Sequence, residues 1–496
     1  MVACNGFTEV TALIPRCMST QHPDNVSAPF FASAPDIAGE DEIREAFYAY
    51  SHLGCDEQMW DVEGKEIDDY VVKKLLSRYP EFFQKYPLGE SLRLTLRVPN
   101  PALERAEAKI LLETLESIPR SFDAARLFYG RDVPPIFEVI LPMTTSAREL
   151  DRVYRYYSDF IVGRQHIRFR PDDLTIAEWI GAFAPDRIRV IPLFEDVASM
   201  LNGDQIVADY LADKTVEDQR VFLARSDTAM NFGLVAAALA NKIALQRLDR
   251  LAHRLGVPIH PILGMGSAPF RGGLSPETAE RVGREYPSVV TFTLQSAFKF
   301  DHPVEQVRAA CAHLRQRAIG RATAVDEDRA RRIIERCSAE YRRQVVRLAP
   351  EINRMARHIP SRRARKLHVG LFGYARGLDN VTLPRAISFT GSLYSLGFPP
   401  ELIALETLDA DDWNFIREVY PSFELKIREA LRFTDPDGEH LTGELRAALD
   451  RAGLGAVPEE EHLSLSRRIR ECLACGDTAQ IEELMVRAAH RRRFLG

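Results

Sequence analysis

The stretch CMSTQHPDN, residues 17–25, decides the fold class. It is a short apolar run that passes directly into polar residues, as a β-strand ending in a loop would. A doubly wound parallel sheet usually carries a GxGxxG turn after its first strand, and this stretch has none. The chain also lacks a GxxxxGK[ST] phosphate loop. The sequence therefore favours a closed barrel over a doubly wound sheet.

Seven further runs of the same kind follow, and amphipathic helical patterns separate them. Their spacing of roughly 30–50 residues suits βα units with long loops, and eight such units predict a (β/α)8 barrel, which typically needs ~250 residues. The predicted strands are residues 18–22, 58–62, 92–97, 136–141, 187–193, 221–224, 259–263 and 290–294.

Helical patterns dominate from about residue 303 onward, and the strand alternation stops there. We therefore expect a (β/α)8 barrel catalytic region over residues 1–302. We expect residues 303–496 to form a mostly α-helical region that packs on the barrel, contributes arginines to the site and makes subunit contacts.

Composition excludes several classes of protein. The 496 residues carry 65 Lys and Arg against 71 Asp and Glu, a net charge of −6, whereas a nucleic-acid-binding chain normally has a basic surplus. No stretch approaches the ~18 consecutive apolar residues of a membrane span, and the N-terminal residues lack the pattern of a signal peptide. We expect a cytoplasmic protein that binds neither nucleic acid nor membrane.

The seven cysteines lie at scattered positions and their number is odd, so they do not form a disulfide framework. Cys472 and Cys475 form a CxxC pair within a helical pattern. A zinc site needs a second pair, and the other cysteines do not supply one. We expect the CxxC pair to be structural or incidental.

Acidic and imidazole groups follow three of the predicted strands, where a (β/α)8 barrel carries its chemistry. His22 follows the first strand, Glu195 the fifth and Asp227 the sixth. Two carboxylates on neighbouring strands suit Mg²⁺ or Mn²⁺, although salt bridges to arginines such as Arg225 would explain them equally well. His22 is either a base or a structural histidine, and the residues alone leave both readings open.

A glycine-rich segment, GMGSAPFRGG at residues 264–273, follows the seventh predicted strand and contains Arg271. Glycines let backbone N–H groups approach an anion, and arginine can form paired hydrogen bonds to phosphate or carboxylate. Such segments also occur as ordinary turns. The position of residues 264–273 favours an anion site, because the loops after strands seven and eight usually bind phosphate in this fold.

The sequence resembles the archaeal-type phosphoenolpyruvate carboxylases from about residue 16 to about residue 400. The matching motifs are CMSTQHPDN, MWDVEGKE, LTLRVPNP, FEVILPMTTS, PLFED, ARSDTAMNFG, GMGSAPFRGGLSP, TLQSAFKFD and IPSRRARK, in this order. The resemblance implies a barrel wrapped in extra helices and a homotetramer. It also implies a metal-dependent, anaplerotic lyase that carboxylates phosphoenolpyruvate with bicarbonate, giving oxaloacetate and phosphate.

The resemblance also implies roles for particular residues. His22 would be the catalytic base, and Arg271 would bind and neutralise anionic groups during catalysis. Glu195 and Asp227 would hold Mg²⁺, with Mn²⁺ as the alternative. Arg362, in PSRRARK, is similar to an arginine that contacts phosphate in the longer bacterial and plant enzymes.

Two departures from those longer enzymes concern cations. Met265 stands where their glycine loop has an arginine, and Met230 stands where they have a lysine. A trianionic substrate would need that charge from elsewhere, and the resemblance does not imply the aspartate or malate inhibition known in the longer enzymes. The candidate substrate-binding residues that could replace the two cations are Arg97, Arg225, Lys299 and Arg376.

Two other functions would share parts of this pattern. A Mg²⁺-dependent aldolase or lyase also forms a pyruvate enolate in a barrel, but it releases no phosphate. A barrel that has lost catalysis would explain the two methionines, yet it would be expected to lose some of His22, Glu195, Asp227 and Arg271 as well. Phosphate release separates the carboxylase from both.

Overall fold

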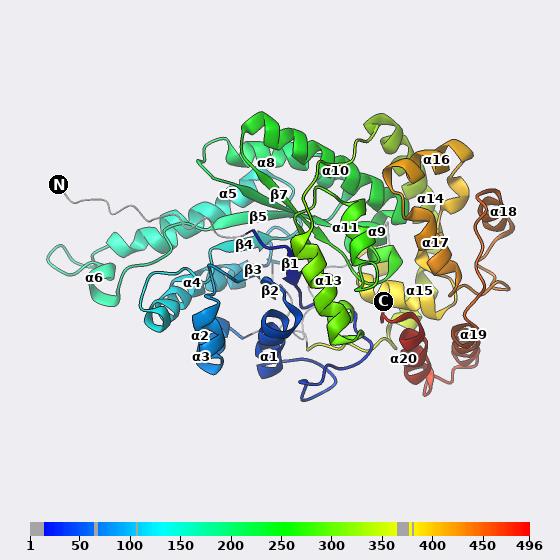
Figure 1. Cartoon of the computed structure of the whole chain (residues 1–496), viewed down its shortest axis with the longest axis horizontal. Helices are drawn as coiled ribbons and strands as arrows, with labels where there is room; N and C mark the ends of the chain where they lie inside the picture. The colour runs from blue at the N-terminus through cyan, green and yellow to red at the C-terminus, as the bar shows by residue number, and fades with distance from the viewer. Residues whose placement is uncertain (1–13, 64–67, 106–107, 365–375, 379–380) are drawn as a thin grey trace.

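The computed structural model describes residues 14–63, 68–105, 108–364, 376–378 and 381–496. Eight parallel strands pair in chain order, and β1 closes the sheet against β8 (Figure 1). Each predicted strand overlaps an observed one, so the (β/α)8 barrel is confirmed. The strands are β1 (Cys17–Ser19), β2 (Glu57–Asp61), β3 (Arg93–Arg97), β4 (Glu138–Leu141), β5 (Arg189–Phe194), β6 (Gln219–Ala224), β7 (Ile259–Gly264) and β8 (Thr291–Leu294).

Helices cover the outside of the barrel and are the main regular elements of the described chain after β8. Those of the barrel part are α1 (Glu40–Tyr48), α2 (Val71–Arg78), α3 (Pro80–Lys85), α4 (Ala108–Tyr129), α5 (Ala147–Arg155), α6 (Ile176–Ile180), α7 (Val197–Leu201), α8 (Gly203–Leu211), α9 (Ser226–Phe232), α10 (Leu234–Leu255), α11 (Ala279–Glu285) and α12 (Ser296–Phe300).

The helical region lies against one side of the barrel, where α14 packs along α10 (Figure 1). One hydrophobic cluster runs without a break from barrel residues such as Ile43 to helical residues such as Leu449. The division at residue 302 remains a prediction. The elements of this region are α13 (Val304–Gln316), α14 (Glu327–Ala356), β9 (Arg376–Leu378), β10 (Val381–Leu383), α15 (Ala386–Ser395), α16 (Ala410–Val419), α17 (Phe423–Leu431), α18 (Gly443–Arg451), α19 (Glu460–Cys475) and α20 (Ile481–Arg492).

A buried ion network fills the end of the barrel where the strands begin. Arg220 of β6 contacts Glu57 of β2 at 2.6 Å and Glu138 of β4 at 2.9 Å, and Arg93 of β3 contacts Glu138 at 2.7 Å. Burial alone would raise the pKa of Glu138, but Arg93 and Arg220 lower it to about 2. These charges close one end of the barrel, so the pocket opens at the opposite end.

The six cysteines in the described ranges are all free thiols, including Cys472 and Cys475 of α19. Cys472 is buried and Cys475 is exposed, and the Cys475 thiol lies 3.5 Å from the Cys472 carbonyl oxygen. Among the described helices, none is long and apolar enough to cross a membrane.

Candidate active site

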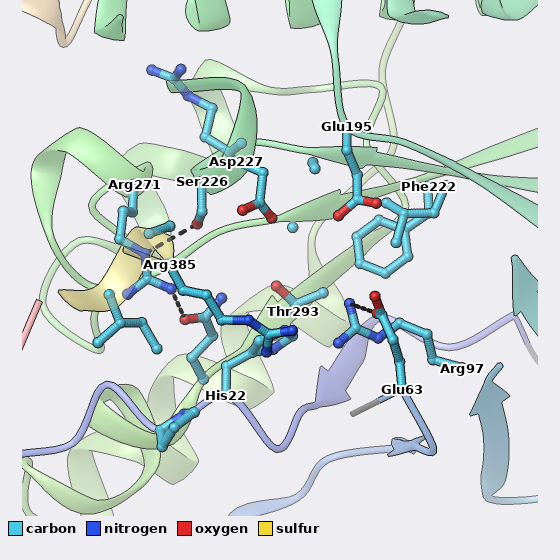
Figure 2. Close-up of a pocket in the computed structure, with 18 residues that line it drawn as sticks. His22, Glu63, Arg97, Glu195, Phe222, Ser226, Asp227, Arg271, Thr293 and Arg385 are labelled. Carbon is cyan, nitrogen blue, oxygen red and sulfur yellow. Dashed lines mark hydrogen bonds and ion pairs between the residues drawn. The ribbon is translucent and has the colours of Figure 1, made fainter. Parts of the chain in front are cut away.

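A pocket opens at the ends of the barrel strands, and residues from most of the strand ends line it (Figure 2). Six of the nine residues predicted from the sequence belong to its lining, and Glu63, Gln295 and Arg385 join them. The predicted residues that line it are His22, Arg97, Glu195, Arg225, Asp227 and Arg271.

Glu195 follows β5 and Asp227 lies in the first turn of α9, directly after β6. Figure 2 shows their carboxylates pointing into the same space between the two strands. Met143, whose φ of 48° lies in the left-handed region, donates its N–H to Glu195 Oε2 at 2.8 Å. Paired carboxylate oxygens with room for water and substrate fit Mg²⁺ or Mn²⁺, so the residues present suit the predicted metal.

His22 is half-buried at the edge of the pocket, just beyond the end of β1. Its Nδ1 lies 2.9 Å from the hydroxyl oxygen of Thr20. This hydrogen bond fixes the orientation of the imidazole ring, so the histidine is held at the mouth rather than in the core.

Arg271 is buried in the loop after β7, and four groups hold its guanidinium. Nε donates to Ser226 Oγ at 3.2 Å, and Nη1 donates to Asp24 Oδ2 at 3.3 Å and to the Gly496 carbonyl at 2.5 Å. Nη2 donates to the side-chain oxygen of Gln295. Burial lowers the pKa of Arg271, and Asp24 opposes that effect. The arginine is therefore fixed in place before any ligand binds.

Arg97, at the end of β3, already has two acidic partners. Its Nε and Nη2 contact Asp61 at 2.7 and 2.8 Å, and its Nη1 contacts Glu63 at 3.0 Å. Burial acts to lower the pKa of Arg97, but the two carboxylates hold it well above its usual range. The charge that Arg97 could offer a substrate is largely neutralised by these neighbours.

A family model described as phosphoenolpyruvate carboxylase matches residues 14–496. Proteins of that name from Methanothermobacter thermautotrophicus and Methanospirillum hungatei are each 53% identical to this chain over 97% of it and 100% of their own length. The one from Halobacterium salinarum is 50% identical over 97% of this chain and 99% of its own.

The chain belongs to the phosphoenolpyruvate carboxylase family. The family and the carboxylase activity that the motifs implied are thus confirmed, and the aldolase and non-catalytic alternatives are set aside. The resemblance extends past residue 400, where the quoted motifs end, to the last residue of the chain.

Three predicted substrate-binding residues of this carboxylase do not direct a described side chain into the pocket. Lys299 is buried in α12 and donates to Glu45 at 2.8 Å and to the Thr20 carbonyl at 2.9 Å. Arg362 is not among the lining residues. Arg376 lies in β9, and its side chain falls outside the part of the chain that the structure describes.

Arg225 lines the pocket, yet its guanidinium turns toward the helical region. Nη1 lies 3.3 Å from the Leu234 carbonyl and Nη2 lies 3.4 Å from the Tyr420 hydroxyl. The guanidinium also lies over the Tyr420 ring, 5.8 Å from its centre. These contacts connect β6 to α10 and to the residue after α16.

Met230 and Met265 are buried, and neither lines the pocket. Met265 packs against Gly272, where an added Cβ would lie 2.6 Å from the Met265 methyl group. The Met230 carbonyl accepts a hydrogen bond from Tyr341 at 2.8 Å. Both methionines therefore fill the core behind the site instead of presenting a cation to it.

Arg385 is a pocket residue that the sequence analysis missed. It occupies the position directly before α15, and Figure 2 shows its side chain extending into the pocket. It lies far along the chain from β8, just after the short strand β10, which does not belong to the barrel. Barrel periodicity gave no reason to place it at the mouth, and only the packing of α15 brings it there.

Glu401 joins the helical region to the loop that carries Arg271. Its Oε1 accepts the N–H of Phe270 and the hydroxyl of Tyr394, both at 2.6 Å. Its Oε2 is buried and has no hydrogen-bond partner among the described residues. Burial raises the pKa of Glu401 to about 7.

Replacing Glu401 with Gln is expected to reduce the loss of stability as the pH rises. The pKa of a Glu carboxyl is ~4.3 in an unfolded chain, and that of Glu401 is about 7 in the folded protein. Between these two pH values the folded state holds a proton that the unfolded state has lost. The free energy of unfolding therefore falls as pH rises through this window and levels off above it. Thermal melts at about pH 5 and about pH 8 measure the drop, which should be smaller in Glu401→Gln.

Asp301, whose pKa burial also raises to about 7, titrates in the same window and leaves a residual drop. A drop in Glu401→Gln equal to that of the wild type would contradict the assignment to Glu401.

Proposed function

We propose that phosphoenolpyruvate and bicarbonate react in the pocket at the barrel mouth. The observation that supports this proposal is that two carboxylates, a histidine and two arginines line one pocket. They are Glu195, Asp227, His22, Arg271 and Arg385. Metal binding, anion binding and proton transfer, which the carboxylation requires, each have a side chain of suitable chemistry in this pocket.

The test is purified protein with phosphoenolpyruvate, bicarbonate and Mg²⁺. Malate dehydrogenase with NADH detects oxaloacetate, and phosphate is measured in parallel. We expect equal amounts of both products, and both should disappear without bicarbonate or without metal. Phosphate accompanied by pyruvate would mean that the enolate meets water before it meets carbon dioxide. Neither product from well-folded, metal-loaded protein would contradict the proposal.

Glu195 and Asp227 would hold Mg²⁺, with Mn²⁺ as the alternative. Such a cation supplies positive charge that stabilises the enolate oxygen. The acidic pair leaves most of a six-coordinate shell to water and substrate oxygens, which is the usual arrangement for Mg²⁺.

Arg271 and Arg385 would bind the anionic groups of phosphoenolpyruvate and offset charge while bicarbonate attacks phosphorus to give carboxyphosphate. Arg271 is fixed by Asp24, Ser226 and Gln295, so little reorganisation is needed when charge develops. Arg385 supplies a cation from α15, the charge that Met230 and Met265 do not provide. Arg97, Arg225, Lys299, Arg362 and Arg376 remain predictions as substrate ligands.

His22 would take the carboxyl proton of the carboxyphosphate, which releases carbon dioxide beside the enolate. The enolate then forms the new carbon–carbon bond. Water must be excluded, because it would protonate the enolate to pyruvate. Gly496 lies beside Arg271, whose guanidinium donates to the Gly496 carbonyl, and the neighbouring Leu495 N–H donates to the Asp24 carbonyl at 2.8 Å.

Arg385→Met is expected to raise the KM for phosphoenolpyruvate about 10–100-fold, since a hydrogen bond to a charged group contributes roughly 1.5–3 kcal/mol. Steady-state assays at saturating bicarbonate measure this. Arg385→Lys keeps the charge and should recover part of the affinity. An unchanged KM in Arg385→Met would exclude Arg385 as a substrate ligand.

We also propose that the enzyme is a cytoplasmic homotetramer, as the family resemblance implies. The free thiols described above suit a reducing compartment. Analytical ultracentrifugation of the purified chain tests the tetramer.

A further inference from the structure

The segment from Gly163 to Arg187, which follows the π-helical turn Tyr156–Val162 and leads to strand β5, is an arm. It meets the rest of its chain chiefly through Phe183, which packs against the main hydrophobic cluster, and through the ion pair of Arg164 with Glu116. Not one of its residues is buried. It contains α6, which stands away from the barrel at the far end of the molecule from the helical region (Figure 1). A segment of this length without a buried residue cannot owe its order to a core of its own.

Large apolar side chains are concentrated on this arm. Five of them are 52% to 68% exposed, and the rings of two, Phe169 and Trp179, contact each other at 6.4 Å. The described part of the region after residue 303 exposes only isolated ones, such as Val304 and Val457. The five on the arm are Ile167, Phe169, Leu174, Trp179 and Ile180.

Together these side chains present on the order of several hundred Å² of apolar surface. The largest apolar patch on a typical monomer is of about this size, and such patches often mark binding sites. A stable interface covers about 800 Å² on each partner. Helix α6 has five residues, far fewer than an isolated helix needs to persist in water. Both features indicate a surface that is covered when the protein assembles.

The charges on the arm indicate which kind of partner would fit this surface. Its outgoing limb, residues 163–170, carries Arg164, His166, Arg168 and Arg170 and no acidic residue. Its returning limb, residues 171–187, carries Asp172, Asp173, Glu178 and Asp186 against one basic residue, Arg187, at its end. One arm therefore presents a basic edge and an acidic edge, so a two-fold copy of it is complementary in charge.

Three of these charges, those of Arg164, Arg168 and Glu178, have partners within the chain. Arg168 lies 3.8 Å from Glu178, and Arg164 lies 2.9 Å from Glu116 of α4. Arg170, Asp172 and Asp173 form no ion pair with any described residue, and the Asp173 carboxylate accepts only the N–H of its neighbour Leu174 among those residues, at 2.8 Å. They are available to a second molecule.

We propose that two copies of this chain pair through residues 163–187, with the basic limb of one arm against the acidic limb of the other and the apolar side chains between them. This surface lies on the barrel part and not on residues 303–496, where subunit contacts were expected from the sequence. The proposal does not depend on the catalytic roles given above.

Charge reversal tests this pairing directly. Arg168→Glu with Arg170→Glu makes both limbs acidic, and Asp172→Arg with Asp173→Arg makes both limbs basic. Each double variant alone should repel its own copy and sediment at no more than half of the wild-type mass. A one-to-one mixture of the two should return to the wild-type mass, because every like-charged contact becomes an opposite-charged one.

The control is Arg284→Glu with Arg308→Glu, an equal change of charge at exposed positions on α11 and α13. It should keep the wild-type mass. Circular dichroism of each variant verifies folding, which these unburied positions should not disturb. Wild-type mass in either double variant, failure of the mixture to recover, or a wild-type chain that is monomeric at micromolar concentration would each overturn the proposal.

Discussion

His22→Asn is expected to convert the carboxylase into an enzyme that makes pyruvate from phosphoenolpyruvate. The barrel mouth would still hold Arg271, Arg385 and the acidic pair, so bicarbonate-dependent release of phosphate should persist. Without a base to take the carboxyl proton, carbon dioxide is not delivered to the enolate, and water protonates it instead. Oxaloacetate formation should fall about 10²–10⁴-fold, the usual contribution of a positioned base.

The measurement compares phosphate, pyruvate and oxaloacetate from one reaction mixture. His52→Asn, at an exposed histidine outside the pocket, is the matched control and should keep the wild-type product ratio. Oxaloacetate from His22→Asn at the wild-type rate would show that another group acts as the base.

Glu195→Gln and Asp227→Asn are each expected to abolish activity through loss of the divalent cation. An amide oxygen keeps the shape of the side chain but removes the negative charge that binds Mg²⁺ or Mn²⁺. Since even loss of a supporting outer group costs about 10–100-fold in metal affinity, loss of a direct ligand should cost more. Titration of each variant with Mn²⁺, followed by electron paramagnetic resonance, measures binding without any need for turnover.

Glu63→Gln provides the control, because Glu63 lines the same pocket but is paired with Arg97 at 3.0 Å. It should change Mn²⁺ affinity much less than the other two substitutions. Wild-type affinity in both Glu195→Gln and Asp227→Asn would move the metal to another part of the enzyme.

Periodicity in the sequence was enough to locate most of this site. Strand-length apolar runs separated by helical patterns can be read locally, and the polar residue after each run must lie at the barrel mouth once the strands are parallel and closed. His22, Glu195, Asp227 and Arg271 were found in this way, and all four line the pocket.

The same rule was less informative for long cationic side chains. Lys299 and Arg225 also follow strands, but a long side chain can turn from the end of its strand toward whichever acceptors the fold supplies. Lys299 meets Glu45, and the Arg225 guanidinium meets Tyr420. Those partners come from α1 and from the residue after α16, and local sequence patterns do not show which distant elements pack together.

The amino-acid sequence by itself determined the barrel, its strands, the family and the four groups that follow the strand ends, because each depends on short-range periodicity or on contiguous motifs. Tertiary structure alone decided that Arg385 enters the pocket, that Met230 and Met265 fill the core, and that residues 163–187 remain uncovered. These outcomes depend on how segments far apart in the chain pack together, and that packing is set by the shapes of whole surfaces rather than by any local pattern.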